Sequence, residues 1–244
     1  RMLLGSDFLE LRPDVRIVLA GDADEEAVAL PSQPGGAPTP VDVDEHCTDL
    51  IATVIEAASQ GLEVVRLVSG DPFLDGDIGA EAAAVARADH DVDVIPGVTG
   101  MTAVPEYAGL ILHGHDVQLI GDAACQRDIA GHGPDWSDQG LIVVHTSAGK
   151  LKEVVKHAVA SGRSEDEPAA LICHGATTQQ ITHTVTLGAL PQTAKTARLD
   201  SAEPVHVAIG KVVEAPDREQ LDWYESKPLF GWNILLSLIH ISEP

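Results

Sequence analysis

The chain has 244 residues, which allows one large domain or two small ones, and with 44% hydrophobic residues it can bury a core. Its formal net charge of −23 argues against nucleic-acid binding, because a phosphate-binding groove needs surplus Lys and Arg. There is no apolar run near the ~20 residues of a membrane span. The three cysteines, Cys47, Cys125 and Cys173, lie far apart in the sequence, which is typical of free thiols in a reducing compartment. We therefore expect a cytoplasmic protein without membrane contact.

Strand-like and helix-like patterns alternate in the first half of the chain. We predict strands over residues 15–20, 64–68 and 92–95. We predict helices over residues 45–60 and 80–88, and a short one that contains Met101 and Ala103. This order predicts a parallel sheet with right-handed crossovers.

The second half mixes strands and helices less regularly. We predict strands over residues 117–120, 141–145, 169–173, 182–187 and 205–213. One amphipathic helix is predicted over residues 151–160, and a short one after Pro191. Two of these strands are expected to form a hairpin, so the chain as a whole is of the α/β class.

The stretch over residues 63–81 is the best candidate for a ligand site. Its β-branched run ends in a turn at residues 69–72, where Pro72 cannot donate to a strand ladder and Gly70 permits close approach to the backbone. A small-residue loop and a helix follow, and open α/β sheets bind ligands where a strand leaves the sheet in this way. The alternative is an ordinary β-turn in which Asp71 caps backbone amides.

Four stretches, in order along the chain, resemble motifs of the tetrapyrrole (corrin/porphyrin) methylases, and among them those of uroporphyrinogen-III C-methyltransferase. Residues 69–73 (SGDPF) resemble a GGDPF turn, and residues 96–100 with 105–109 (PGVTG, PEYAG) resemble PGVTS and PAYAG. Residues 175–178 with 184–188 (GATT, TVTLG) resemble GTT and TGTLG. Residues 223–231 (WYESKPLFG) resemble the linker that joins this methylase to uroporphyrinogen-III synthase in fused enzymes.

This resemblance implies a two-lobed tetrapyrrole methylase-like α/β fold, with a parallel-sheet lobe, a mixed-sheet lobe and the cleft between them. The expected bounds are 1–112 for the first lobe, 113–215 for the second, and 216–236 for a linker toward a synthase domain. The family's first glycine-rich loop is expected before Arg1, and residues 237–244 are interpreted as a foreign tail. The resemblance also implies a homodimer.

The resemblance implies S-adenosyl-L-methionine as cofactor and assigns it a set of contact residues. These residues are Ser69, Gly70, Asp71, Leu74, Thr99, Gly100, Thr146 and Gly175. Thr146 follows a predicted strand where the family usually has Met, Thr99 could instead be a helix N-cap, and Gly175 could be a plain turn glycine. No metal site is predicted, because His113 and His115 lack a third ligand at a motif spacing.

The reaction implied by the resemblance is C-methylation of uroporphyrinogen III to precorrin-2, toward sirohaem or cobalamin. Asp7 matches the position of the family's catalytic base. The alternative is that Asp7 is an ordinary surface residue. Three family arginines are absent, since Asp77, Gln179 and Ile181 stand in their places. Those arginines could pair with the carboxylates of the substrate, which an acidic protein otherwise repels. Two rivals therefore stay open: a related methylase with another substrate, and a catalytically degenerate lobe that acts as scaffold for a fused synthase.

Overall fold

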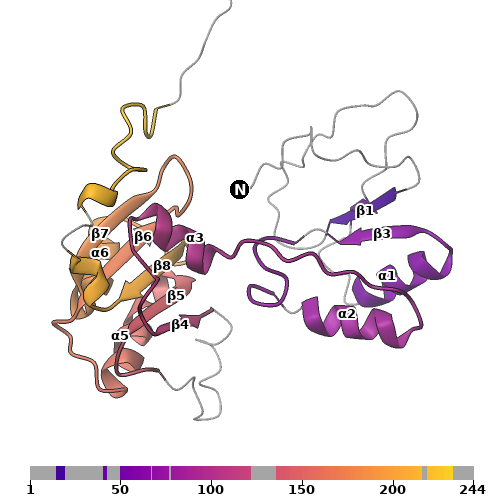
Figure 1. The fold of residues 1–244 in the computed structure, drawn as a ribbon, viewed down its shortest axis with the longest axis horizontal. Helices are drawn as coiled ribbons and strands as arrows, with labels where there is room; N and C mark the ends of the chain where they lie inside the picture. Colours follow the sequence, from indigo (N-terminus) through magenta and orange to yellow (C-terminus); the bar gives the residue numbers. More distant parts are fainter. Residues whose placement is uncertain are drawn as a thin grey trace, which may run out of the picture. The chain divides into compact units, whose positions relative to one another are not determined.

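The structure is a computed structural model, in which the chain forms two compact units, Arg1–Thr99 and Gly100–Pro244 (Figure 1). It describes the backbone of residues 15–19 and 41–42, and then residues 50–66, 68–76, 78–121, 136–215 and 219–232. Across these ranges no helix is both long enough and apolar enough to cross a membrane. The expected boundary between residues 112 and 113 and the expected linker stay predictions, and the supposed foreign tail lies outside the described residues.

The first unit is built on a parallel sheet with the strand order β2-β1-β3. Its strands are β1 (Val15–Leu19), β2 (Val41–Asp42) and β3 (Glu63–Arg66). Its helices are α1 (Leu50–Ser59) and α2 (Ile78–Arg87), which bury Ala57 and Val85. Gly61, at φ +77°, stands just past α1, where only glycine adopts a left-handed conformation without strain. The parallel pairing and the helix end agree with the sequence prediction.

The strand predicted over residues 92–95 is wrong. Residues 91–99 form neither strand nor helix, and Ile95 is 79% exposed. Asp91 and Asp93 are of a residue type that strands disfavour, and Pro96 removes a ladder donor at the end of the run. The helix predicted after this stretch is confirmed as α3, Gly100–Tyr107.

The second unit contains a five-stranded mixed sheet with the order β4-β5-β8-β6-β7. Its strands are β4 (Val117–Ile120), β5 (Leu141–Ser147), β6 (Pro168–Cys173), β7 (Ile181–Thr186) and β8 (Pro204–Ile209). Besides α3, the α-helices among its described residues are α5 (Leu151–Ala160) and α6 (Leu190–Thr196). Short 3-10 turns are η3 (Ala148–Lys150), η4 (Leu187–Ala189), η5 (Lys211–Glu214) and η6 (Glu219–Leu221). The mixed sheet and the antiparallel β6–β7 hairpin confirm the α/β prediction.

The two faces of this sheet bury separate apolar clusters. One cluster joins the sheet to Met101 and Val104 of α3, and the other joins it to α5 and α6. Successive residues of β5 alternate between them, as the pleat of a strand requires: Val143 packs in the α3 cluster and Val144 in the α5 cluster. Along β5, residues with odd numbers therefore face the α3 cluster and residues with even numbers face the α5 cluster.

The last strand is shorter than predicted. The sequence indicated one strand over residues 205–213, but β8 ends at Ile209 and residues 211–214 form η5. Gly210 interrupts the strand at φ +144°, and a Cβ there would lie 2.8 Å from the carbonyl oxygen of Gly140. The close approach of the two backbones thus requires glycine, whose amide still donates to the carbonyl of Pro168 at 2.9 Å.

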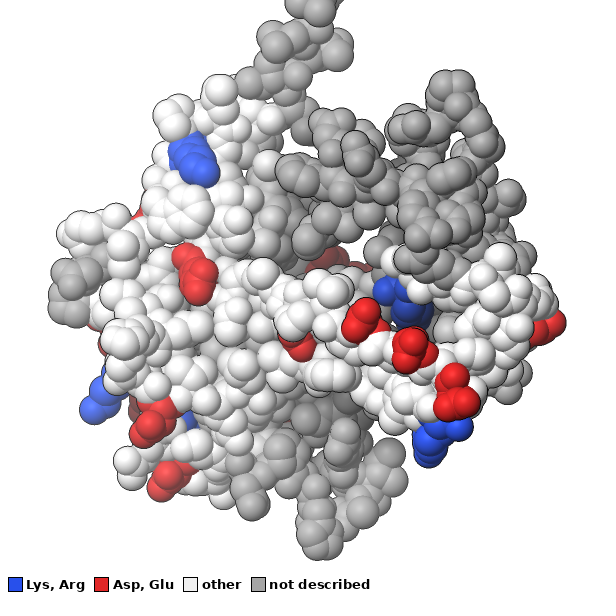
Figure 2. Space-filling model, turned by 45° about the vertical axis from the view of Figure 1, so that its right-hand side comes forward, with Lys and Arg blue, Asp and Glu red and all other residues white. Residues whose placement is uncertain are grey.

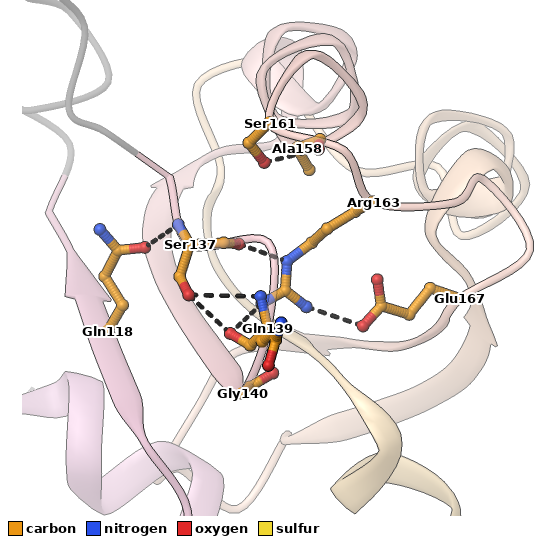
Figure 3. Close-up of polar contacts among 8 residues, drawn as sticks. All are labelled: Gln118, Ser137, Gln139, Gly140, Ala158, Ser161, Arg163 and Glu167. Atoms are coloured by element: carbon orange, nitrogen blue, oxygen red, sulfur yellow. Dashed lines mark hydrogen bonds and ion pairs between the residues drawn. The ribbon is translucent and has the colours of Figure 1, made fainter.

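A buried arginine fixes the loop that leads into β5 (Figure 3). Arg163, whose side chain is 0% exposed, donates to the carbonyls of Ser137 and Gln139 at 2.7 Å and of Gly140 at 3.2 Å. Its fourth partner is the Glu167 carboxylate, at 2.7 Å. The planar guanidinium thereby donates to three backbone carbonyls of one loop at once, so β5 starts from a fixed point.

Candidate functional site

The predicted cofactor turn is held together by two carboxylates. Oδ1 of Asp71 accepts hydrogen bonds from the amides of Phe73 at 3.0 Å and Leu74 at 3.1 Å. Oδ2 of Asp75 accepts one from the amide of Asp71 at 2.7 Å. Gly70 adopts φ +74°, and a Cβ there would overlap Oδ2 of Asp75. The capping role considered for Asp71 is therefore present, and Gly70 is required by the turn itself.

The segment that leads into α3 packs directly on this turn. A Cβ at Gly97 would overlap the carbonyl oxygen of Gly70, so only glycine fits between the two backbones. Thr99, which is 7% exposed, donates its hydroxyl to Oδ1 of Asp75 at 2.7 Å. Two of the resembling motifs thus meet within the first unit, through a carboxylate that the sequence analysis did not single out.

The turn presents an apolar surface beside two negative charges. Phe73 is 65% exposed and Leu74 is 44% exposed, while Ser69 is exposed as well. The four donors that reach Asp71 and Asp75 in these contacts are all neutral, so these contacts among the described residues bring no positive charge to either carboxylate. A ligand with a cationic group next to an apolar one fits this combination.

In the second unit, Gly100 opens α3 beside a pair of histidines. His145 of β5 and His206 of β8 are register partners, and their rings stack at 4.5 Å between centroids and 16° between planes. A Cβ at Gly100 would lie 3.1 Å from Nε2 of His206. Burial, helped by neighbouring His145, lowers the pKa of His206 to about 3. The neutral imidazole is therefore the form present around neutral pH.

Gly175 lies against α3 on the same face of the sheet, whereas Thr146 does not. A Cβ at Gly175 would lie 2.5 Å from Cγ1 and 2.6 Å from Cγ2 of Val104. Thr146 belongs to β5, not to the position after it, and it is 2% exposed. By the alternation along β5, its side chain lies on the α5 side and that of His145 on the α3 side. The expected position of Thr146 after the strand is thus corrected.

The remaining predicted residue, Asp7, lies outside the described residues. The sequence analysis missed Asp75, Gly97 and the histidine pair. The four-residue spacing between Asp71 and Asp75 was a signal that could have identified Asp75. The pairing of His145 with His206 depends on strand register, which the sequence does not give. Among the described residues, no three His, Cys, Asp or Glu side chains come together as metal ligands.

Comparison with known proteins assigns the chain to a class. The family model for the tetrapyrrole (corrin/porphyrin) methylases matches residues 12–191. The chain is 30% identical over 229 residues to a uroporphyrinogen-III C-methyltransferase from Sinorhizobium sp, covering 91% of this chain and 75% of that protein. It therefore belongs to the tetrapyrrole methylase family.

A longer relative and two solved structures are also similar to the chain. Siroheme synthase 1 from Serratia proteamaculans (strain 568) is 34% identical over 183 residues, which cover 72% of this chain and 37% of the relative. The chain thus matches little more than a third of that relative's length. The crystal structure of uroporphyrin-III-C-methyltransferase from Thermus thermophilus has a TM-score of 0.62 at 24% identity, covering 90% and 91% of the two chains. A structure of that type complexed with S-adenyl homocysteine has a TM-score of 0.58 at 21% identity, covering 86% and 90%. These likenesses show a shared fold.

Proposed function

We propose that this protein transfers methyl groups from S-adenosyl-L-methionine to carbon atoms of uroporphyrinogen III, yielding precorrin-2. Support comes from membership of the methylase family and from the 229-residue likeness to the Sinorhizobium methyltransferase. The Thermus relative that is complexed with S-adenyl homocysteine supports the choice of cofactor.

The structural observation that carries the proposal is the doubly negative turn. S-adenosyl-L-methionine bears a sulfonium and an ammonium cation next to apolar methylene groups. The carboxylates of Asp71 and Asp75, with exposed Phe73 and Leu74 beside them, match that distribution. From the family pattern we also assign to cofactor binding Ser69, Gly70 and Thr99 in the first unit and Gly100, Thr146 and Gly175 in the second. The assignment of Thr146 rests on that pattern alone, since its side chain is buried on the α5 side.

The chemistry assigned to the bound cofactor is the donation of its sulfonium methyl. Bound S-adenosyl-L-methionine would supply this methyl to an electron-rich pyrrole carbon and would leave as S-adenosylhomocysteine. Every outer pyrrole carbon of uroporphyrinogen III already carries a carboxylate arm, so the proton that a base later removes comes from another position of the macrocycle. We propose Asp7 as that base, from its position in the family pattern. The protein's main contribution is to align the two reactants. We further propose a cytoplasmic homodimer.

One observation favours the rival functions, a different substrate or a scaffold role. On the face drawn in Figure 2, several basic side chains of the described residues lie beside acidic ones. Gln179 and Ile181, which replace family arginines, are both exposed. Substrate carboxylates therefore lack the bidentate partners that arginine would provide at these two positions.

The test is calorimetric titration of the chain with S-adenosyl-L-methionine and with S-adenosylhomocysteine, which lacks the sulfonium charge. Asp71→Asn keeps the oxygen that accepts from Phe73 and Leu74 but removes the charge. We expect this variant to bind S-adenosyl-L-methionine about fivefold more weakly. Its affinity for S-adenosylhomocysteine should fall less, because that ligand carries no sulfonium charge. Asp89→Asn, an exposed change at φ +66°, is the matched control and should leave both affinities unchanged.

Transfer of labelled methyl groups to uroporphyrinogen III follows as the second measurement. Binding with transfer supports the proposal, and binding without transfer favours a methylase with another substrate. If the unaltered chain binds neither ligand at millimolar concentration, the methyltransferase function is wrong and the scaffold role takes its place.

A further inference from the structure

The segment over residues 219–232 is packed on the second unit by aromatic rings. The ring of Tyr107, at the end of α3, lies 5.3 Å from that of Trp223 and 4.4 Å from that of Tyr224. Phe230 meets Tyr224 edge-on at 5.1 Å. Such ring pairs each contribute beyond their buried area, so the segment that resembles a linker is attached to the fold here.

Within this segment, Glu225 reaches the first residues of β7. Its Oε1 accepts from Nε2 of Gln180 at 2.9 Å and from the hydroxyl of Thr182 at 2.5 Å. Its Oε2 accepts from the Thr182 amide at 3.1 Å. Three donors converge on one carboxylate, and hydrogen bonds to an ionised acceptor are the strong kind.

Gln180 carries this contact to the loop that contains Gly175. The residue is 1% exposed, and its Oε1 accepts from the Ala176 amide at 2.8 Å. Because Ala176 supplies a donor and Glu225 an acceptor, the side-chain amide has one possible orientation. Glu225, Gln180 and Ala176 therefore form a continuous hydrogen-bonded chain.

The loop at the end of this chain has an unusual backbone. His174 has φ +49° and Ala176 has φ +59°, a region that residues with a Cβ rarely adopt. Gly175 lies between them and against Val104. A loop with two such residues persists only where its surroundings hold it, and contacts that do so include Gln180 on Ala176 and Glu203 on Nδ1 of His174 at 3.2 Å.

We propose that Glu225 is a positioning residue: acting through Gln180, it holds the Gly175 loop in the conformation that binds the methyl donor. The inference rests on the proposed function, since Gly175 is assigned there to the cofactor surface. It gives the segment over residues 219–232 a part in cofactor binding, beyond that of a tether.

Three variants of the full chain test this role. Glu225→Ala removes all acceptors, Glu225→Gln keeps one oxygen without the charge, and Asp222→Asn removes an equal charge from an exposed residue of the same segment. We expect S-adenosylhomocysteine to bind about tenfold more weakly to the alanine variant and about threefold more weakly to the glutamine variant, the graded loss typical of a charge-assisted hydrogen bond. The asparagine variant should bind like the unaltered chain.

Two further readouts separate positioning from general stability. Amide hydrogen exchange at Ala176 should accelerate in the two Glu225 variants while exchange in the core strand β5 is unchanged. In the methyl-transfer assay the KM for the methyl donor should rise while kcat stays within about twofold, because the loop serves binding. If Glu225→Ala does not fold, the comparison of Glu225→Gln with Asp222→Asn carries the test.

The outcomes are distinct from those that test the function. If the unaltered chain does not bind S-adenosylhomocysteine, the proposed function fails and this inference with it. If the unaltered chain binds but both Glu225 variants bind equally well, the positioning role alone is overturned.

Discussion

The hydroxyl of Thr99 and the carboxylate of Asp75 are joined by a hydrogen bond of 2.7 Å across 24 positions of sequence. Oδ2 of the same carboxylate accepts from the Asp71 amide. Asp75 therefore couples the residue that precedes α3 to the conformation of the turn. In the proposed function, both partners of this bond shape the surface that receives the methyl donor.

Thr99→Val keeps the shape of the side chain and removes the donor. We expect a loss of about 1 kcal/mol in the free energy of unfolding, the size of one hydrogen bond, and weaker S-adenosylhomocysteine binding. Urea unfolding and calorimetry measure the two effects. Thr196→Val, at an exposed residue whose hydroxyl bonds within its own helix, is the control. Equal behaviour of the two variants would contradict the role of the Thr99–Asp75 bond.

Gly175 and Val104 provide a test of packing in the second unit. Gly175→Ala should destabilise the fold, because the new methyl would lie 2.5 Å from Val104. Val104→Ala removes both clashing methyls, so the double variant should be more stable than the two single changes predict, with a coupling of about 1–3 kcal/mol. Gly121→Ala, where the nearest atom lies at 3.9 Å, should be close to neutral. Strict additivity in thermal unfolding would refute the contact.

The buried side chain of Arg163 should be costly to remove. Arg163→Ala leaves three carbonyls and Glu167 without their donor, and we expect it to cost about 3–5 kcal/mol. Arg163→Lys keeps the charge but not the planar fork, so it should recover less than half of that loss. Lys156→Ala, at an exposed position of α5, is the control. If Arg163→Ala lowers the free energy of unfolding by less than about 1 kcal/mol, Arg163 does not fix the loop before β5.

His206 predicts a specific response to acid. Its pKa falls from 6.5 to about 3 on folding, because burial and neighbouring His145 disfavour the imidazolium. Between these values the unfolded chain binds a proton that the native state does not, so the stability present above pH 6.5 is lost as the pH falls toward 3. His206→Gln should reduce the slope of unfolding free energy against pH by up to about 1.4 kcal/mol per unit.

Urea unfolding at several pH values measures this slope for the unaltered chain and the variant, which share the same background of titrating carboxylates. His113→Gln, an exposed residue, is the control. Parallel curves for the unaltered chain and His206→Gln would show that His206 does not titrate between folded and unfolded states in this way.

The sequence predicted those elements whose signals are local. The β-branched run of β5 and the apolar stripe of α5 each fixed an element without help from its neighbours. The run at residues 92–95 failed because two aspartates and a proline outweighed its three apolar residues. Gly210, just past the end of β8, lies against the backbone of Gly140, and a contact between such distant residues has no local pattern in the sequence.

The candidate site divides in the same way. Glycine and aspartate in a short turn were sufficient to locate Gly70 and Asp71. The side of the sheet that Thr146 faces depends on which helix covers which face of the sheet. The sequence of a single strand does not contain this information. The hydrogen bonds of Glu225 span 43 to 45 positions, a separation that no short motif encodes.

The aromatic packing of the segment over residues 219–232 also gives the molecule an optical signature. Two of its three tryptophans, Trp223 and Trp232, lie in that segment at 47% and 72% exposure, whereas Trp136 is 8% exposed. Red-shifted fluorescence emission will therefore report on the segment and blue-shifted emission on the core. Release of the segment can be followed in the unlabelled protein as a change of one component of its emission spectrum.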